Sequence, residues 1–112
     1  MNPLHIDIYE TEDAVIVRLA GDAGIQAAQA LEMPLQRIVA SQVALVIFDL
    51  VGLEHAASLF LGTLVNFRRG MISRGGRVQL AGVQPRILET LQISRLDQLF
   101  ELIASAPVAV VQ

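Results

Sequence analysis

The stretch VALVIFDLVGLEHAASLFLGTL, residues 43–64, carries the clearest fold signal in the sequence, a strand that leads into a helix. Its first part is a continuous apolar run of β-branched and leucine residues, which is typical of a central strand covered on both faces. We expect this strand to end at Asp49 and an exit turn to follow it. The second part begins a helix whose first turn reads Ser-Leu-Phe, although surface helices seldom place bulky apolar residues there. Because a strand-to-helix junction exposes N–H groups and holds side chains on a rigid scaffold, we expect the functional site at this junction.

The helix predicted over residues 58–73 has one broad apolar face at the ~100° spacing of an α-helix. The central members of that face are Phe60, Leu61, Leu64, Phe67 and Met71, and Val65 and Ile72 widen it. Leu59 points nearly opposite to them, so we expect it to be exposed. The glycines of RGG, residues 74–76, tolerate positive φ and should end the helix.

Strands and helices alternate on both sides of this stretch. Upstream, LHIDIYE (4–10) and AVIVRLAG (14–21) predict a β-hairpin. Residues 21–41 predict a helix that Pro34 should kink or split into two pieces. Downstream, the expected elements are a strand at 77–83, a helix at 84–94, a strand at 99–104 and a short helix or tail at 105–112. This order predicts a single α/β domain over residues 1–112, with a mixed sheet of four or five strands and covering helices.

Composition narrows the class of protein. With 112 residues, 54% hydrophobic content and 17% charged residues, the chain is long and apolar enough for a globular core. It has no cysteine, which excludes disulfides and thiolate chemistry. The longest apolar run, VALVIF, is far too short to span a membrane, and MNPLHIDIYE lacks the pattern of a signal peptide. We therefore expect a cytoplasmic protein.

The basic residues do not favour nucleic-acid binding. The net charge is −3, and four of the eight arginines are confined to RRGMISRGGR, residues 68–77. A nucleic-acid site needs a broader basic face, usually with aromatic residues for stacking. Arginines near the C-terminus of a helix interact favourably with its dipole, which is the simpler explanation for this cluster.

The sequence does not assemble an active site. His5 and His55 are far apart in the chain and neither has a second ligand at helical spacing, so a zinc site is not expected. A glycine-rich phosphate loop is missing, and Ser58 does not lie in a GxSxG motif. We therefore expect no enzymatic activity, no metal and no cofactor.

Four segments, in their order along the chain, resemble the STAS domain, the fold of bacterial anti-sigma-factor antagonists. They are the hairpin ending in RLAGD, the strand ALVIFDLVGLEH, the segment LGTLVNFRRGMISRGGRVQLAGV and the segment PRILETLQISRLDQLFELI. Together they cover nearly the whole chain. The resemblance implies a mixed sheet with covering helices, and a cytoplasmic bacterial signalling regulator that binds protein partners and takes part in partner switching.

The resemblance places the family's phosphorylation motif, Asp-Ser-Ser-Gly, on residues 57–60, which here read Ala-Ser-Leu-Phe. Ser58 is therefore the candidate phosphoacceptor, although a role as helix N-cap would also account for it. Because the other three positions differ, we expect Ser58 not to be phosphorylated in the cell. Leu59 and Phe60 add apolar area near the docking surface, while Phe60 also falls on the core face. The implied partner-binding residues are Ala57, Ser58, Leu59, Gly62 and Thr63.

Two functions fit this pattern. The first is a non-enzymatic regulatory module resembling an anti-sigma-factor antagonist, which docks an anti-sigma factor or a serine kinase-like regulator through the start of the helix at 58–73. The alternative is a constitutive structural subunit of a larger assembly, such as a stress-signalling complex or a lipid-transport ABC system, without a phosphorylation switch. The modification state of Ser58 distinguishes the two.

Overall fold

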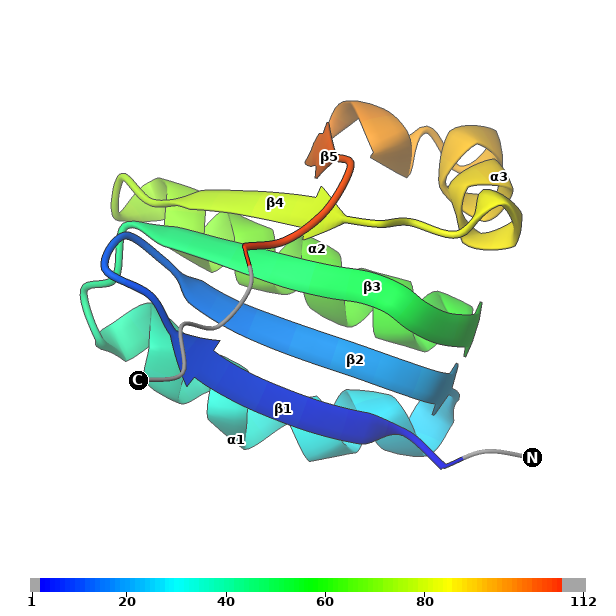
Figure 1. The fold of residues 1–112 in the computed structure, drawn as a ribbon, viewed down its shortest axis with the longest axis horizontal. Coiled ribbons are helices and arrows are strands. Elements are labelled where there is room, and N and C mark those ends of the chain that lie inside the picture. The colour runs from blue at the N-terminus through cyan, green and yellow to red at the C-terminus, as the bar shows by residue number, and fades with distance from the viewer. Residues whose placement is uncertain (1–2, 108–112) are drawn as a thin grey trace.

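The computed structural model describes residues 3–107 as one five-stranded mixed sheet with helices packed on it (Figure 1). The strands are β1 (His5–Glu10), β2 (Val15–Ala23), β3 (Leu45–Ala56), β4 (Arg77–Ala81) and β5 (Glu101–Ile103). The helices are α1 (Ile25–Ala40), α2 (Ser58–Ser73), α3 (Pro85–Ile93) and the short 3₁₀ helix η1 (Leu96–Gln98). The predicted α/β fold with a mixed sheet is confirmed, and α2 has the predicted bounds.

The strands lie in the sheet in the same order as in the sequence. β1 and β2 form the predicted antiparallel hairpin, and every later neighbour pair is parallel. The connections from β2 to β3 and from β3 to β4 cross the sheet in the same direction, and each contains a helix. Right-handed crossovers therefore place α1 and α2 on the same face of the sheet, behind it in Figure 1.

The main core lies between the sheet and these two helices. Alternate strand residues point into it, as the two-residue period of a strand requires. They include Val15, Val17, Leu19, Val46, Phe48, Leu50, Val78 and Leu80. The ring of Phe48 meets that of Phe67 edge to face, with 5.4 Å between the centroids. The five central residues of the apolar face predicted for α2 are buried, which confirms that part of the prediction. The face is narrower than predicted, because Val65 is only partly buried and Ile72 is 45% exposed.

The central strand β3 is longer than its sequence suggested. Residues 46–50 form the longest unbroken buried run in the described chain, although β2 has the larger share of buried residues. However, the strand does not end at Asp49: it continues to Ala56, because β2 also continues and pairs Ala23 with Ala56. Gly52 permits this close pairing, since a Cβ there would lie 2.9 Å from the Cβ of Ala20. The predicted strand end at Asp49 was therefore wrong.

Helix α1 runs without a break through Pro34, so of the two predicted effects of this proline, a kink or a split, the split does not occur. Proline removes the hydrogen bond to the carbonyl four residues earlier, which belongs to Ala30. Ala30 is exposed, and water can therefore solvate that carbonyl. The helix also begins later than expected, because residues 21–23 extend β2.

The opposite face of the sheet carries a smaller apolar cluster of Ala14, Ile16, Ile47 and Ala81. The segment after β5 crosses in front of this face in Figure 1, and Ala106 packs against the cluster. The Tyr9 hydroxyl donates a hydrogen bond to the Pro107 carbonyl at 3.2 Å. β3 is thus covered by helices on one face and by the chain's own C-terminal segment on the other. Residues 105–107 are not helical, and the rest of the helix or tail predicted there lies outside the described residues.

Candidate protein-docking site

The end of β2 positions the N-terminus of α2. The Ala57 N–H donates to the Ala23 carbonyl at 2.8 Å, and the Leu61 N–H then donates to the Ala57 carbonyl at 3.1 Å to begin the helix. Ala57 is therefore the N-cap and Ser58 is the first helical residue. Ser58 lies next to the cap, and no side-chain hydrogen bond caps this helix end. The structure thus contradicts the explanation of Ser58 as a hydrogen-bonding cap.

The predicted docking residues share the outer side of the first two turns of α2. Ser58 and Gly62 are exposed, while Ala57 and Thr63 are partly exposed. Leu59 is 54% exposed, which confirms the prediction made from its position opposite the apolar face. We call residues 57–63 on this side the α2 ridge. Phe60 does not belong to the ridge, because its side chain is fully buried in the core.

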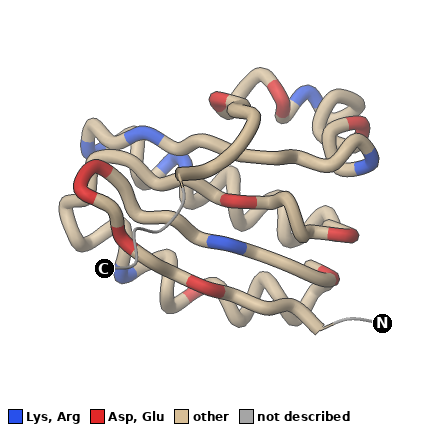
Figure 2. The backbone as a smooth tube through the Cα atoms, viewed as in Figure 1, with Lys and Arg blue, Asp and Glu red and all other residues tan. Residues whose placement is uncertain are grey.

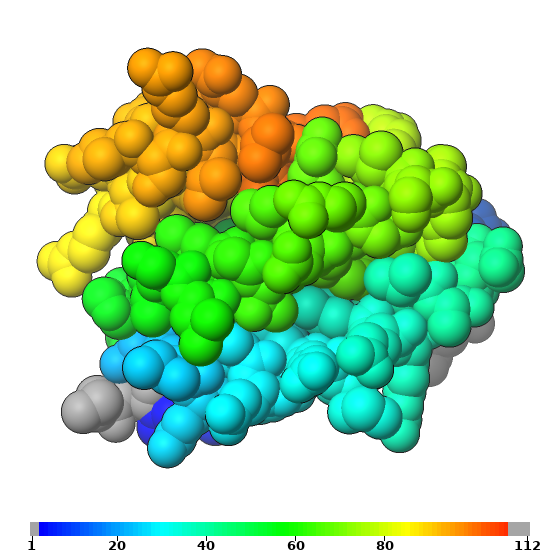
Figure 3. Space-filling view, turned by 180° about the vertical axis from the view of Figure 1, so that it is seen from behind, coloured from blue at the N-terminus to red at the C-terminus, as the bar shows by residue number. Residues whose placement is uncertain are grey.

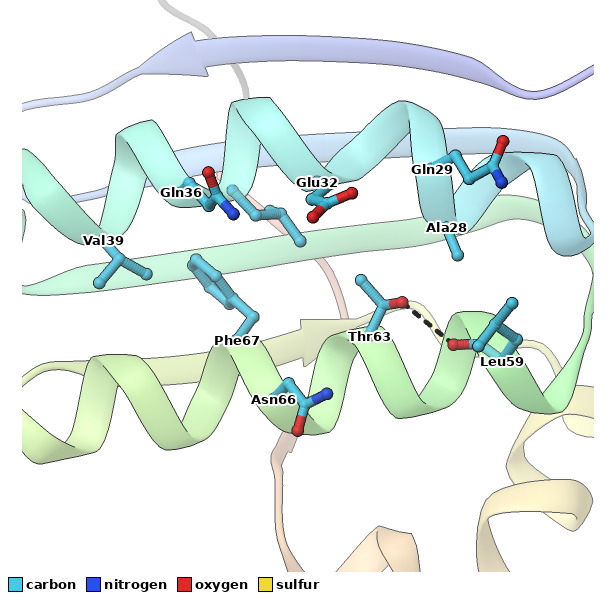
Figure 4. Close-up of a pocket in the computed structure, with 10 residues that line it drawn as sticks. Ala28, Gln29, Glu32, Gln36, Val39, Leu59, Thr63, Asn66 and Phe67 are labelled. Atoms are coloured by element: carbon cyan, nitrogen blue, oxygen red, sulfur yellow. Dashed lines mark hydrogen bonds between the residues drawn. The ribbon is translucent and has the colours of Figure 1, made fainter.

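A groove of about 580 Å³ runs along one side of the ridge, between α1 and α2 (Figure 4). Leu59 and Thr63 border it from α2, and Ala28, Leu35 and Phe67 supply apolar surface. Its polar lining consists of Gln29, Glu32, Gln36, Thr63 and Asn66. An apolar surface with hydrogen-bonding groups around it, here four uncharged side chains and the carboxylate of Glu32, is typical of a protein-docking groove. The sequence pattern did not indicate this groove, because it forms only where two helices distant in sequence pack together.

A second hollow, of about 300 Å³, lies on the other side of the ridge, toward α3. Ser58 and Gly62 line it from α2, and Thr90, Ser94 and Leu96 line it from the opposite side. The space-filling view from the helix side shows α2 as a ridge between α1 and α3 (Figure 3). The α2 ridge therefore projects between the groove and the second hollow, a shape that lets a partner contact it on both sides.

Gly62 is unexpected at its position in the interior of α2. No atom lies within 4 Å of the place that a Cβ would occupy, so packing within the chain does not require glycine. Glycine inside a helix is less favourable than alanine by ~1 kcal/mol. Next to it, the Thr63 hydroxyl donates to the Leu59 carbonyl at 3.0 Å, which satisfies the threonine within the helix. Gly62 therefore leaves a position without a side chain on the α2 ridge, and packing within the chain does not explain why this residue is glycine.

The electrostatics of the ridge are those of a helix N-terminus with no compensating acid. The first turn of α2 has no acidic residue, so the positive end of the helix dipole is not neutralised from within that turn. None of the five ridge residues is charged. His55 and Arg86 line a smaller hollow of about 140 Å³ that shares Thr90 with the hollow beside Ser58. The surroundings of Ser58 are thus compatible with an anion.

Within residues 3–107, no group of three or more histidine, cysteine, aspartate or glutamate residues is arranged to hold a metal ion. His5 lies on β1 and His55 on β3, in separate parts of the sheet. None of the helices in the described part of the chain is long and apolar enough to cross a membrane.

The sequence profile of the STAS domain matches residues 5–109, nearly the whole chain. The chain therefore belongs to the STAS domain family.

Solved structures of other proteins share this fold. An anti-sigma factor antagonist from Mycobacterium paratuberculosis superposes with a TM-score of 0.81 at 20% identity, over 90% of this chain and 86% of that chain. The anti-sigma factor antagonist SpoIIAA in its unphosphorylated form gives 0.72 at 17% identity, over 94% and 90%. A sulfate transporter family protein from Wolinella succinogenes gives 0.74 at 15% identity, over 85% and 80%. At these identities the likeness demonstrates a common fold.

Proposed function

We propose that this chain is a non-enzymatic, protein-binding regulatory module similar to the anti-sigma-factor antagonists, and that it docks its partner through the α2 ridge. The single observation that carries the proposal is the 54% exposure of Leu59 on an uncharged ridge between two hollows. At this exposure the Leu59 side chain contributes little to the stability of its own chain. Its burial against a second protein would contribute free energy of binding.

The expected contribution of Leu59 is large enough to matter. Fully burying a leucine side chain contributes about 1.5–3 kcal/mol before the entropic cost of association. The adjacent groove between α1 and α2 accepts an apolar side chain of the partner against Phe67 and Leu35. Interfaces typically concentrate their binding energy in a few such central contacts.

The proposed partner is an anti-sigma factor or a serine kinase-like regulator. Membership of the STAS family and the fold shared with two anti-sigma factor antagonists support this class of partner. The uncharged ridge further suggests that apolar contact, rather than charge pairing, holds the complex together.

Ser58 remains the candidate phosphoacceptor on this ridge. Its side chain is exposed, and the N-terminal N–H groups of α2 favour an added anion. A phosphate would bring close to two negative charges beside Leu59, and the partner would have to desolvate them on docking. Phosphorylation would therefore release the partner. The Bacillus protein SpoIIAA, which shares the fold with a TM-score of 0.70 at 18% identity, has been solved in a phosphorylated form.

The alternative function is a constitutive structural subunit of a larger assembly, and one observation favours it. Residues 57–60 read Ala-Ser-Leu-Phe, and Phe60 is fully buried, so a bulky core residue occupies the place of the motif's glycine. A kinase that reads a small, flexible motif would not recognise this turn. On this alternative the ridge is a permanent interface and Ser58 is not modified.

The test compares Leu59→Asp with Ile93→Asp, which changes a 77% exposed apolar residue at the end of α3. Isothermal titration calorimetry would measure binding to purified anti-sigma factors and serine kinase-like regulators of the source organism. We expect Leu59→Asp to weaken binding at least about tenfold, the equivalent of 1.4 kcal/mol, and Ile93→Asp to bind like the wild type. Circular dichroism should show both variants folded. Equal binding by both variants would rule out the ridge as the docking site.

A further inference from the structure

The outer edge of β1 is a second interaction surface, separate from the α2 ridge. β1 is the first strand in the sheet order, and within residues 3–107 no strand pairs with its outer edge. Figure 1 shows it along one side of the sheet, with α1 behind it. An edge strand offers its backbone N–H and C=O groups to another strand, so natural proteins usually protect such edges.

This edge is apolar on its helix side. Leu4 and Ile6 pack partly against the core, but Ile8 is 45% exposed. Leu4 shares a hollow with Ala27 and Ala30 of α1, which places that side of α1 next to β1. One turn further along the same side of the helix, Met33 is 57% exposed. The strand edge and the helix flank therefore form one apolar strip that the described chain leaves uncovered.

We propose that the strip is the interface of a symmetric homodimer, in which β1 pairs antiparallel with β1 of a second copy. The two sheets then join into one, and both helical layers lie on the same side of it. Residues directly opposite each other in an antiparallel pair point to the same face. With both helical layers on the same side of the sheet, the two-fold axis must therefore pass through a residue of β1. Near the middle of the strand that residue is Ile6, Asp7 or Ile8, which gives three possible registers.

Charge and polarity select one of these registers. An axis through Asp7 would oppose two carboxylates, and an axis through Ile8 would oppose Ile6 and Glu10. An axis through Ile6 opposes Leu4 to Ile8 on the helix side, and His5 to Asp7 on the other face. Because the axis repeats each contact, the strand is complementary to itself in this register alone.

The charges on neighbouring strands support the same register. Asp7 lies opposite Arg18 on β2, and Arg18 lies opposite Asp49 on β3, with 3.2 Å between Arg18 Nε and Asp49 Oδ2. Figure 2 shows these acidic, basic and acidic positions side by side across the three strands. The partner's His5 would extend this row with a hydrogen-bond donor beside Asp7. His5 itself lies opposite the small side chain of Ala20, which leaves room for that contact.

The absence of cysteine from the sequence allows a direct test of the register. With the axis at Ile6, the two Cα atoms of residue 6 lie about 4.5–5.5 Å apart, within the range of a disulfide. At a rise of ~3.4 Å per residue, the two Cα atoms of residue 7 would be about 8 Å apart, too far to bridge. We therefore expect Ile6→Cys to form a disulfide-linked dimer on mild oxidation, and Asp7→Cys and Ile8→Cys to remain largely without an intermolecular disulfide. Preferential cross-linking at position 7 or 8 would overturn the proposal.

Sedimentation velocity tests the dimer without cysteine. We expect the wild type to be dimeric, and Ile8→Glu to raise the dimer dissociation constant at least about a hundredfold, because the axis repeats the change. Ile72→Glu is the matched control, since Ile72 is also 45% exposed but lies on α2. A wild type that stays monomeric at millimolar concentration would refute the proposal, as would a dimer unaffected by Ile8→Glu. A monomer that binds an unrelated extended peptide along β1 would also refute it, and would assign the edge to a different partner.

Discussion

Replacing Gly62 with alanine should make the protein more stable and, at the same time, weaken partner binding. Gly62 lies in the interior of α2, where glycine is conformationally unfavourable. The space that a Cβ would occupy there is open, since beyond its own stretch of helix backbone the Cβ would meet no atom within 4 Å. The added methyl group therefore causes no clash within the chain, and it remains exposed on the α2 ridge.

The size of the effect follows from helix propensity. Alanine is favoured over glycine by about 0.8–1.0 kcal/mol in a helix interior. An unfolding entropy of about 2.1 cal/mol/K per residue gives roughly 0.24 kcal/mol/K for 112 residues. The free energy of unfolding should thus rise by about 0.9 kcal/mol, and Tm by about 4 °C. If a partner packs directly on Gly62, the extra methyl group should cost about 1–3 kcal/mol of binding.

Gly70→Ala is the matched control, because Gly70 lies in the same helix but away from the ridge. A Cβ at Gly70 would lie 3.6 and 3.7 Å from two methyl carbons of Val39, which is ordinary van der Waals contact. Thermal unfolding should show a similar gain in Tm for both variants, and titration calorimetry should show weaker partner binding for Gly62→Ala alone. A lower Tm for Gly62→Ala would refute the placement of this residue in a helix with open surroundings. A higher Tm with unchanged binding would remove Gly62 from the docking site.

The remaining predictions concern a charge, a close contact and an ion pair. Ser58→Asp should weaken partner binding, whereas Ser58→Ala should bind normally. Mass spectrometry of protein from its native cells should find no stoichiometric phosphate on Ser58, and finding one would show that the protein is an antagonist switched by phosphorylation. Gly52→Ala should lower the free energy of unfolding by about 1–3 kcal/mol, because its Cβ would lie 2.9 Å from that of Ala20, and an unchanged denaturation midpoint would contradict this. The hydrogen bond from Arg77 lowers the pKa of Glu101 in the folded protein below its ordinary value of 4.5. The ion pair therefore stabilises the folded protein above pH 4.5, and this stability is lost as the pH falls toward the lower pKa of the folded state. Denaturation of Glu101→Gln should therefore show a small loss of stability at pH 7 and none at strongly acidic pH.

Much of the α2 ridge was predictable because it depends on a single helix. The apolar period of residues 58–73 identifies the buried side, and therefore places Leu59 on the exposed side. The ambiguous residue was Phe60, which fits both the core face and the docking surface in the sequence; packing assigns it to the core. The two hollows that flank the ridge were not predictable, since their other walls come from α1 and α3.

The α/β class, the alternation of strands and helices, and the bounds of α2 could be predicted from the residues alone, because they follow from local hydrophobic periodicity and from glycine and proline positions. Tertiary structure decided how far β3 extends, since its last residues are strand only through pairing with the equally extended β2. It also decided that the C-terminal segment covers the second face of the sheet, through contacts such as that between Tyr9 and Pro107. Local pattern reports which side of an element is apolar. Only the packing of segments distant in the sequence determines what covers that side, and which part of it stays exposed for a partner.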